Sequence, residues 1–432
     1  MMVKERTSIG MIGIGYVGLV TGTCLAELGN HVICMDIDSE KITALREGQI
    51  PFYEPGLPEL VAKNRDNMTF TTSLTDIFDN CELVFIAVDT PPTFTGDADL
   101  SRVFAVMSAL PGLTTDNHIL IMKSTVPVGT GNKISSELAR MEVGRIDYVS
   151  NPEFLREGSA IDDFLHPDRV VIGSHHPEAG EKVAALYKNL DAQILRTNVP
   201  TAEMIKYASN AFLATKISFI NEIANVCEEV GADVTIVADG MGRDKRIGKH
   251  FLNAGIGFGG SCFPKDVTAL KQIAGNSGYH FQLLTAVIEV NELQKRRVVN
   301  KLQKHLGTLA DKTIALLGLA FKPNTSDLRE ASSIVLASRL LGDGALVKAY
   351  DPVAIPYAAK AVRGILLCDD ILSAVKDSDA VVLVTEWDEF ADLPLEKMKE
   401  LMRTPLIIDG RNLLDPQTVR DAGFTYEGIG RS

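Results

Sequence analysis

Cys262 stands in the segment GFGGSCFPKD, where its neighbours suit a reactive thiol. Three glycines precede it, and residues without side chains let the backbone come close to a bound molecule. Lys265 and Asp266 follow at i+3 and i+4, so a helical turn that begins near the cysteine places all three on one side. A nearby ammonium lowers the pKa of a thiol and makes thiolate available. The pattern suits a nucleophilic cysteine, and the alternative is a small buried side chain.

A glycine-rich turn near the N-terminus suits a dinucleotide. Gly13, Gly15 and Gly18 form a GxGxxG pattern between a predicted strand and a predicted helix. These glycines permit a tight turn, close approach of backbone amides to a pyrophosphate, and packing of helix on strand. Asp36 ends the next strand, 18 residues after Gly18, where a carboxylate accepts hydrogen bonds from ribose hydroxyls. A 2′-phosphate meets a like charge there, so the pattern favours NAD over NADP; the alternative is a tight turn without a cofactor.

Polar residues also follow other predicted strands and line a predicted helix. Glu153 and Glu157 lie in NPEFLREGSA, which begins where a strand ends, and they are candidates for a general base and a polar ligand. The segment KSTVPVGT (123–130) ends another strand with hydroxyl side chains. Lys206 and Asn210 share one helix face, where a buried pair can hold an oxyanion or a water. Their spacing alone favours a solvated lysine and a surface asparagine.

The first two hundred residues alternate short apolar segments with amphipathic helical stretches. Such segments, apolar on both faces, indicate a parallel sheet that is covered on two sides. The predicted strands are 8–14, 31–35, 83–88, 119–122, 148–150 and 170–172. A helix then runs from Thr201, its predicted cap, to Val230, before Gly231. A helix of about 30 residues spans roughly 45 Å, long enough to connect two domains.

A third region repeats the pattern of the first without its glycine fingerprint. We predict strands at 313–317, 346–350, 380–384 and 406–408, a helix over 332–341, and Asp351 directly after the second strand. Lys322 and Arg329 flank the turn-rich loop KPNTSDLR, where they suit phosphate and where plain surface charge explains them equally well. We therefore expect an α/β protein with two doubly wound, Rossmann-like domains joined by a long central helix and a helical middle region.

Composition limits the class of protein. The 432 residues, 46% hydrophobic and 23% charged, are typical of a chain with sizeable cores, and at roughly 150 residues per domain they allow about three domains. The 43 basic and 56 acidic residues give a net charge of −13, and no stretch concentrates Lys and Arg. A nucleic-acid partner is therefore not expected.

Cysteine spacing and hydropathy indicate the cellular compartment in which we expect the protein. The six cysteines lie at least ten residues apart, which excludes a CxxC zinc or redox motif, so we expect reduced thiols and no metal site. The uncharged segment 7–26 behind Arg6 resembles a signal peptide, but its five glycines argue against export. No run approaches the roughly 18 apolar residues of a membrane span. We expect a cytoplasmic protein without a membrane partner.

Seven short motifs occur in order along the chain: GIGYVG, TPP (90–92), STVPVGT, NPEFLREG, KYASNAF, GFGGSCFPKD and GLAFKPNTSDLRE. In this order they resemble the UDP-glucose/GDP-mannose 6-dehydrogenase family from end to end. NPEFLREGSAIDDFLHPDR and GGSCFPKD look most like the branch that acts on UDP-glucose. Asp89 departs from the family pattern, which commonly has Gly before Thr-Pro-Pro. The extra carboxylate either weakens NAD binding or points outward.

The resemblance implies a double oxidation of UDP-glucose to UDP-glucuronate with two NAD. Cys262 would add to the C6 aldehyde as a thiolate, and the second hydride transfer would leave a thioester that water hydrolyses. The other catalytic positions implied are Lys206 and Asn210 for oxygen charge at C6, Asp266 for positioning or activating water, Glu153 as general base of thioester hydrolysis, and Thr125 for the water network and the cofactor.

The resemblance also implies two binding sets and an assembly. For NAD they are Gly13, Gly15, Tyr16, Val17, Gly18, Asp36, Lys41, Thr90, Thr125, Glu157, Lys265 and Arg329. For the UDP-sugar they are Glu153, Phe154, Leu155, Arg156, Glu157, Lys206, Asn210, Arg246, Phe251, Leu252, Asn253, Ala254, Gly255, Gly259 and Lys322. Arg246 matches an arginine that crosses from a partner subunit, so a homodimer or higher homo-oligomer is expected. The implied domains are an NAD-binding domain over 1–200, a helical dimerisation region over 201–305 and a UDP-sugar-binding domain over 306–432.

Three alternatives stay open. A GDP-mannose or other nucleotide-sugar 6-dehydrogenase shares the chemistry with another base or sugar. A β-hydroxyacid dehydrogenase of the 6-phosphogluconate type shares the first domain and a Lys/Asn helix pair, but makes one two-electron oxidation and needs no cysteine. An NAD-sensing module would bind the cofactor without chemistry. A yield of two NADH per substrate would distinguish a nucleotide-sugar 6-dehydrogenase from the 6-phosphogluconate type, and the presence of Cys262, Lys206 and Asp266 together argues against a module without chemistry.

Overall fold

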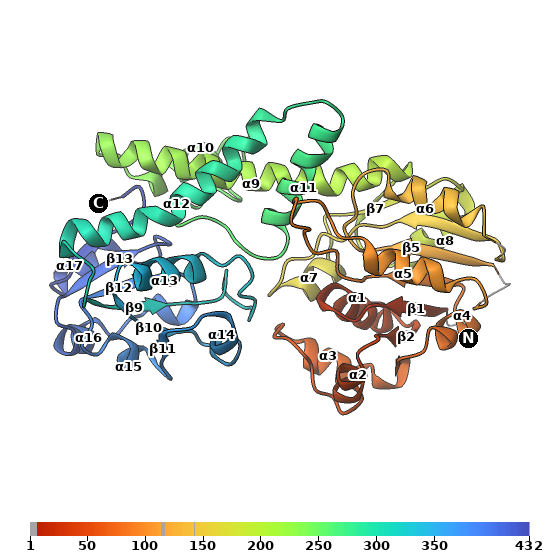
Figure 1. Ribbon diagram of the computed structural model, residues 1–432, viewed down its shortest axis with the longest axis horizontal. Helices are drawn as coiled ribbons and strands as arrows, with labels where there is room; N and C mark the ends of the chain where they lie inside the picture. The colour runs from red at the N-terminus through yellow and green to blue at the C-terminus, as the bar shows by residue number, and fades with distance from the viewer. Residues whose placement is uncertain (1–6, 114–116, 142, 432) are drawn as a thin grey trace. The chain divides into compact units, whose positions relative to one another are not determined.

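The computed structural model describes residues 7–113, 117–141 and 143–431. The chain divides into two compact units, residues 1–209 and 210–432, and each holds one of the two sheets (Figure 1).

The first unit is built on an eight-stranded sheet in the order β3-β2-β1-β4-β5-β6-β7-β8. Its neighbours pair in parallel except β6 and β7, which run antiparallel, so the expectation of an all-parallel sheet is wrong at that point. The helix between them in the chain, α7, has only six residues, and β7 runs alongside β6 in the opposite direction. The strands are β1 (Ser8–Ile12), β2 (His31–Met35), β3 (Met68–Thr71), β4 (Leu83–Ile86), β5 (His118–Met122), β6 (Ile146–Ser150), β7 (Arg169–Ser174) and β8 (Gln193–Thr197).

Alternate strand residues face two separate cores, which explains the continuous apolar runs. Met11 and Phe85 pack into the core on one face, and Ile12 and Ile86 pack into the core on the other. Helices α1 (Tyr16–Glu27), α2 (Ser39–Arg46), α3 (Leu57–Lys63), α7 (Ala160–Leu165) and α8 (Pro177–Leu186) supply the first core. Helices α4 (Leu74–Asn80), α5 (Ser101–Ala109) and α6 (Thr130–Leu138) supply the second.

Several strand limits differ from the prediction for local reasons. β1 ends at Ile12 instead of residue 14 because Gly13 adopts φ +89°. β4 ends at Ile86 instead of residue 88. Two strands escaped prediction: β3 has only four residues, and β8 has a largely exposed surface without the apolar run of a buried strand.

The predicted spine is helix α9 (Val199–Val230), 32 residues long, which runs from the first unit into the second. It begins two residues earlier than predicted. Asn198 Oδ1, and not Thr201, caps it, by accepting a hydrogen bond from Thr201 N at 2.9 Å. Gly231 follows its last residue with φ +74°, as a helix stop requires.

The second unit repeats the strand order of the first around β9. Its sheet is β11-β10-β9-β12-β13-β14, parallel throughout. The strands are β9 (Thr313–Leu317), β10 (Leu346–Tyr350), β11 (Ile365–Leu367), β12 (Ala380–Leu383), β13 (Leu406–Asp409) and β14 (Thr425–Glu427), of which β11 and β14 were not predicted. The helices are α10 (Val234–Gly242), α11 (Phe263–Asn276), α12 (Gln282–Leu306), α13 (Ser332–Gly342), α14 (Ile355–Ala361), α15 (Ile371–Val375), α16 (Leu395–Leu401) and α17 (Pro416–Asp421). Two doubly wound domains and a long helix were expected, and both are present.

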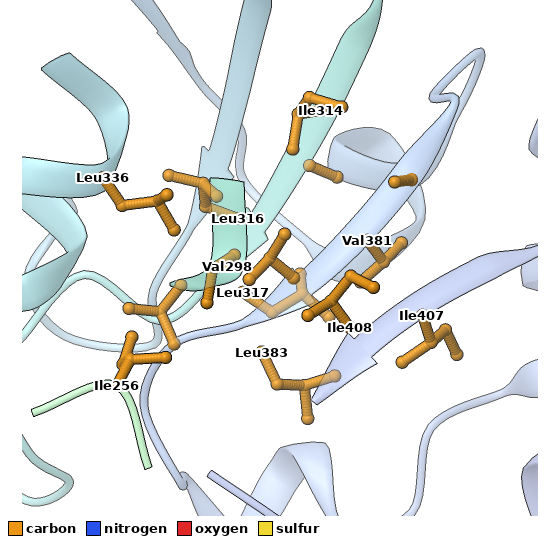
Figure 2. Close-up of a cluster of buried hydrophobic side chains, with 14 of the residues drawn as sticks. Ile256, Val298, Ile314, Leu316, Leu317, Leu336, Val381, Leu383, Ile407 and Ile408 are labelled. Carbon is orange, nitrogen blue, oxygen red and sulfur yellow. The ribbon is translucent and has the colours of Figure 1, made fainter. Parts of the chain in front are cut away.

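The core of the second unit anchors the segment that precedes Cys262. Ile256 is 1% exposed and belongs to the same apolar cluster as Leu317 of β9 and Leu383 of β12 (Figure 2). The backbone joins the packing, because Ile256 N donates to Gly410 O at 3.1 Å. The glycine-rich segment is therefore fixed to the sheet. Within the described residues, no helix is long and apolar enough to cross a membrane.

Candidate active site

The glycine turn after β1 has the geometry of a phosphate cradle. A Cβ on Gly13 would lie 2.9 Å from Ala87 O, and one on Gly18 would lie 1.9 Å from Gly13 O, so both positions exclude side chains. A Cβ on Gly15 would meet only Asp89 Oδ1, at 3.5 Å, which leaves this turn open. Gly15 caps α1 without a side-chain hydrogen bond, so the first amides of the helix face the opening. This geometry suits an anion, and the turn lies at the point where the strand order reverses between β1 and β4.

Asp36 follows β2 and faces the same turn. Its carboxylate accepts hydrogen bonds from Ile14 N at 3.0 Å and from Lys41 Nζ at 2.7 Å. Burial acts to raise the pKa of Asp36, but these hydrogen bonds and the one from Asp38 N outweigh it and lower that pKa below its usual value. The group is therefore an anion, as ribose recognition requires. Lys41, which the sequence places five residues away, pairs with it directly.

The loops after β4 and β5 are tied together beside the glycine turn. Thr90 is buried, and its Oγ1 donates to Thr125 O at 2.8 Å, while Ser124 Oγ donates to Val88 O at 2.6 Å. Asp89 forms an ion pair with Arg102 at 2.7 Å, and both side chains are exposed. The carboxylate that departs from the family pattern thus has a cation partner and borders the opening over Gly15.

The segment 151–160 carries a buried ion pair. Glu153 Oε1 lies 2.7 Å from Lys206 Nζ, and the two side chains are only 5% and 4% exposed. Glu153 Oε2 also accepts from Leu155 N at 2.6 Å. Phe154 packs beside them with the Arg169 guanidinium 3.7 Å from its ring centroid. The interpretation of Lys206 as a solvated lysine is wrong, because α9 carries it into this buried site.

The end of this segment is held by Glu54, a residue that the sequence did not single out. Its buried carboxylate accepts from Tyr16 Oη at 2.6 Å, Gly158 N at 2.6 Å and Ala160 N at 2.7 Å. Tyr16 is the first residue of α1, so the hydrogen bonds of Glu54 connect the glycine turn to the segment that contains Glu157. Arg156 is exposed and pairs with Asp163. The sequence gives little indication of a role for Glu54, because a single glutamate outside a motif does not form a recognisable pattern.

Cys262 lies at the N-cap position of α11 and is partly exposed, whereas the other five cysteines are buried. Burial raises the pKa of Cys24, Cys34 and Cys81 to about 12, so these thiols stay protonated. A thiol at the N-terminus of a 14-residue helix instead has the helix dipole to stabilise its anion. This placement fits a nucleophile.

Asp266 and Asn210 form a second buried pair, in the second unit. Asn210 Nδ2 donates to Asp266 Oδ2 at 2.7 Å, and Asp266 is 0% exposed. Lys265 pairs with the other carboxylate oxygen of Asp266. The prediction of a surface asparagine is wrong here too. Lys206 and Asn210 share a helix but have different carboxylate partners, Glu153 and Asp266.

The segment 251–260 is fixed by side chains that the sequence did not single out. Asn291 Oδ1 accepts from Phe258 N at 2.8 Å and its Nδ2 donates to Phe258 O at 3.1 Å. Gly255 is held in the same way, because its N–H donates to Asn221 Oδ1 at 2.8 Å and its carbonyl accepts from Gln294 Nε2 at 2.9 Å. Leu252 and Ala254 are buried in the core, Asn253 is exposed, and Phe251 adopts φ +64°. Single buried amides inside long helices give no local motif, which is why sequence reasoning missed them.

The loop after β9 is the counterpart of the glycine turn and is built differently. Asp351, at the position that Asp36 has in the first unit, is 1% exposed and accepts from Leu319 N at 2.7 Å and Ala320 N at 3.0 Å. It also accepts from Trp387 Nε1 at 3.1 Å, so its oxygens are occupied within the protein. This carboxylate orders the loop instead of facing a ribose.

That loop reaches the cysteine segment. Gly260 N donates to Arg329 O at 2.9 Å, and a Cβ on Gly259 would lie 2.2 Å from Glu330 O. Arg329 pairs with Asp327, and Lys322 lies 5.5 Å from the ring centroid of Phe321. Arg246 pairs with Asp244 and its side chain is 89% exposed.

These residues test whether NAD fits. A side chain does not fit at Gly13 or Gly18, whereas the turn is open at Gly15. The α1 amides lack a side-chain cap, and the ionised carboxylate of Asp36 directly follows β2. The arrangement fits a dinucleotide. Among the described residues, no group of three or more His, Cys, Asp or Glu side chains could hold a metal ion.

Comparison with known proteins gives matches along the whole chain. Three models of the UDP-glucose/GDP-mannose dehydrogenase family match: the NAD binding domain over residues 7–191, the central domain over 200–293 and the UDP binding domain over 315–416. The UDP-glucose 6-dehydrogenase TuaD of Bacillus subtilis is 51% identical over 98% of this chain and 93% of its own length. A UDP-glucose 6-dehydrogenase of Pseudomonas aeruginosa is 47% identical over 98% and 97%. A solved UDP-glucose dehydrogenase of Pyrobaculum islandicum superposes with a TM-score of 0.93, at 36% identity over 100% of this chain and 99% of that one.

Proposed function

The chain belongs to the UDP-glucose/GDP-mannose dehydrogenase family, and we propose that it oxidises C6 of UDP-glucose twice to give UDP-glucuronate. The observation that carries this proposal is Cys262, the partly exposed thiol at the N-terminus of α11, next to the Lys265–Asp266 pair. An enzyme that oxidised an alcohol only once would need no such nucleophile.

NAD is the cofactor, and when bound it accepts a hydride at each oxidation. Gly13, Gly15 and Gly18 admit its pyrophosphate to the α1 amides, and Asp36 accepts hydrogen bonds from a ribose. The further contacts we propose for NAD are Tyr16, Val17, Lys41, Thr90, Thr125, Glu157, Lys265 and Arg329. The contacts we propose for the UDP-sugar are Phe154, Leu155, Arg156, Glu157, Arg246, Phe251 to Gly255, Gly259 and Lys322.

Cys262 makes the second oxidation possible. Its thiolate adds to the C6 aldehyde left by the first hydride loss, forming a C–S bond and a thiohemiacetal that again carries an oxidisable C–H bond. Loss of the second hydride from that carbon leaves a thioester. Lys206 and Asn210 stabilise the charge that develops on the C6 oxygen, and their burial strengthens this interaction.

Water then releases the acid. Glu153 takes a proton from the water, the hydroxyl oxygen bonds to C6, and the C–S bond breaks so that Cys262 departs as thiolate. Asp266 positions or activates this water, and Thr125 supports the water network. In total one UDP-glucose, two NAD and one water give UDP-glucuronate, two NADH and three protons.

We further propose a homodimer or higher homo-oligomer, in which Arg246 serves the neighbouring active site. Phe212, Phe219 and Val226 recur every seven residues on α9 and are 66%, 49% and 57% exposed. Apolar side chains at this spacing form one exposed stripe, which association of two copies covers. The Arg246 side chain is also 89% exposed, which supports a contact with a partner.

The assignment of regions follows from these roles. We propose an NAD-binding domain over 1–200, a dimerisation region with the cysteine segment over 201–305 and a UDP-sugar-binding domain over 306–432. A cytoplasmic location is supported by the five buried cysteines, which are free thiols. The acidic net charge of −13 supports the absence of a nucleic-acid partner.

An assay with UDP-glucose and GDP-mannose as competing substrates tests the function. With NAD present, NADH absorbance should rise with UDP-glucose and the product should be a uronate by mass spectrometry. Turnover of GDP-mannose with little response to UDP-glucose would overturn the proposed substrate, and failure with every nucleotide sugar would overturn the proposed activity.

A further inference from the structure

Glu203 is a buried carboxylate that no step above uses. It lies near the start of α9 and is 3% exposed. Its Oε2 accepts a hydrogen bond from Gly129 N at 2.7 Å, and its Oε1 accepts one from Gly131 N at 2.8 Å. A carboxylate taken out of water is costly unless hydrogen bonds compensate for the lost hydration. Both oxygens of Glu203 have such a bond, and both bonds come from one short stretch of backbone.

That stretch is the beginning of α6, where the local sequence provides no cap. Gly129 occupies the N-cap position with φ +96°, and it has no side chain that could accept from the first amides of the helix. Glu203 accepts from them instead, from 74 residues further along the chain. A Cβ on Gly131 would overlap Tyr148 and Val199, so the beginning of α6 is also closely packed. Glu203 therefore fixes the end of the loop that precedes α6.

The loop before α6 carries Thr125, and its other end is attached as well. Thr90 Oγ1 donates to Thr125 O at 2.8 Å, and Ser124 Oγ donates to Val88 O at 2.6 Å. These bonds attach the beginning of the loop to the loop after β4, while Glu203 attaches its end to α9. Thr125 thus lies between two attachments.

Thr125 leaves the sheet at the same edge as Glu153. β5 ends at Met122 and β6 ends at Ser150, and these two residues are partners in the parallel pairing of the strands. Thr125 and Glu153 each follow their strand by three residues. A shift of the loop before α6 would therefore change the placement of Thr125 relative to Glu153.

The helix that supplies the cap also supplies the partner of Glu153. Lys206 follows Glu203 by three residues, so the two side chains lie on the same face of α9. Lys206 Nζ lies 2.7 Å from Glu153 Oε1. One turn of α9 thus holds both the loop that carries Thr125 and the buried ion pair of Glu153.

We propose that Glu203 is a positioning residue: by capping α6 it holds Thr125 in place relative to the Glu153–Lys206 pair. The inference rests on the proposed function, in which Thr125 supports the water network and contacts NAD. Without the carboxylate, two buried amides lose their partners and the beginning of α6 shifts to find others. Thr125 then no longer orders the water from which Glu153 takes a proton, so release of the acid slows more than the oxidations before it.

The first test follows the decay of the covalent adduct on Cys262. Glu203→Gln keeps the shape of the side chain but presents an NH2 group to one of the two amides. Glu178→Gln, an exposed glutamate in the first turn of α8, is the matched control. Burial raises the pKa of Glu203 to about 7, so the enzyme is mixed with UDP-glucose and NAD at pH 8.5, where the wild type is ionised. Intact-mass measurement after quenching gives the rate of decay.

Adduct decay should slow about tenfold in Glu203→Gln, and KM for NAD should rise about threefold. KM for UDP-glucose and adduct decay in the control should stay within about twofold of the wild type. A folded Glu203→Gln variant with wild-type adduct decay would overturn the inference. If Glu203→Gln does not fold, Glu203→Asp, which keeps the charge on a shorter side chain, is measured against the same expectations.

A second pair of variants separates positioning from a merely structural role. If Glu203 acts through Thr125, adding Glu203→Gln to Thr125→Ala should slow adduct decay by less than about a further twofold. The same tenfold slowing with and without Thr125 would show that Glu203 acts on the fold in general, and would contradict the inference.

Hydrogen exchange keeps this inference separate from the proposed function. In Glu203→Gln, amide exchange in residues 124–131 should be at least about tenfold faster than in the wild type, whereas exchange in residues 151–157 should be unchanged. Wild-type enzyme that makes neither adduct nor uronate contradicts the proposed function, and the exchange rates still report on the cap. Wild-type enzyme that makes uronate, with equal exchange of residues 124–131 in both proteins, contradicts the inference alone.

Discussion

Cys262 differs from the other five cysteines in its surroundings, and the surroundings decide its chemistry. The others lie in apolar cores, where burial keeps three of them protonated beyond any physiological pH. Cys262 has a helix N-terminus and the Lys265–Asp266 pair instead. Lys206 and Asn210 also differ from surface residues of the same types, because each is buried against a carboxylate. Among residues of one type, burial and charged neighbours therefore distinguish the residues that we propose to be reactive from the others.

We propose that the choice of dinucleotide depends on Asp36. Its anion faces the ribose site and would repel a 2′-phosphate, although Lys41 at 2.7 Å reduces that repulsion. We expect kcat/KM to favour NAD over NADP by at least about tenfold, roughly 1.4 kcal/mol. Asp36→Asn should reduce the preference for NAD over NADP, because it removes the negative charge. Lys41→Ala should increase that preference, because it removes the cation that offsets the charge. Equal efficiency of the wild type with both dinucleotides, measured by initial rates, would contradict this role.

We expect Lys123, which follows β5 and is 5% exposed, to affect stability in a pH-dependent way. Burial lowers the pKa of Lys123 to about 7 in the folded chain, while an unfolded chain has a lysine pKa of about 10.4. Between these values the unfolded state binds the extra proton, so the burial penalty is full below pH 7 and is relieved as the pH rises towards 10. Lys123→Met should therefore raise Tm at pH 7 by more than it does at pH 9.5. A gain that is constant across this range would contradict the lowered pKa.

The elements put these residues in place, and the sequence predicted them unevenly. β1, β2, β9 and β12 were predictable because strands buried on both faces read as continuous apolar runs. β8 was not, because it is an exposed edge strand, and the antiparallel turn into β7 leaves no local signal. The burial of Lys206 and Asn210 depends on segments more than fifty residues away. Spacing on one helix could not reveal those partners.

We propose that the rigidity of segment 251–260 matters for binding of the sugar. Asn291 holds both backbone groups of Phe258. Asn291→Ala leaves them buried without partners, which should cost about 2 kcal/mol of unfolding free energy. KM for UDP-glucose should rise more than KM for NAD. Asn300→Ala, an exposed position on the same helix, is the control, and thermal unfolding with steady-state kinetics measures both effects. An unchanged KM for UDP-glucose in a folded Asn291→Ala variant would contradict a role of the segment in sugar binding.

At the scale of the whole molecule, one strand order occurs twice with different loop chemistry. The first unit keeps a glycine turn and a carboxylate at the proposed ribose site. In the second unit, the Asp351 carboxylate accepts hydrogen bonds from the loop after β9 and from Trp387. One fold thus supplies two kinds of nucleotide site, in line with the NAD binding and UDP binding domains that match.

Assembly is tested by complementation. If Arg246 serves the neighbouring site, Arg246→Ala and Cys262→Ser chains should each be nearly inactive alone. Mixed after dissociation and reassociation, they should regain up to about a quarter of wild-type activity, because half of the assemblies are heterodimers and each has one intact site. Light scattering that shows an active monomer would contradict the shared site.

The central claim is covalent capture by Cys262, and the yield of NADH tests it most directly. With limiting UDP-glucose, the wild type should release two NADH per substrate and form uronate through an adduct on Cys262. Cys262→Ser should bind UDP-glucose and NAD with near-normal affinity but fail to accumulate uronate, either because no adduct forms or because a serine ester stalls. If Cys262→Ser releases two NADH and forms UDP-glucuronate at the wild-type rate, the covalent mechanism is wrong.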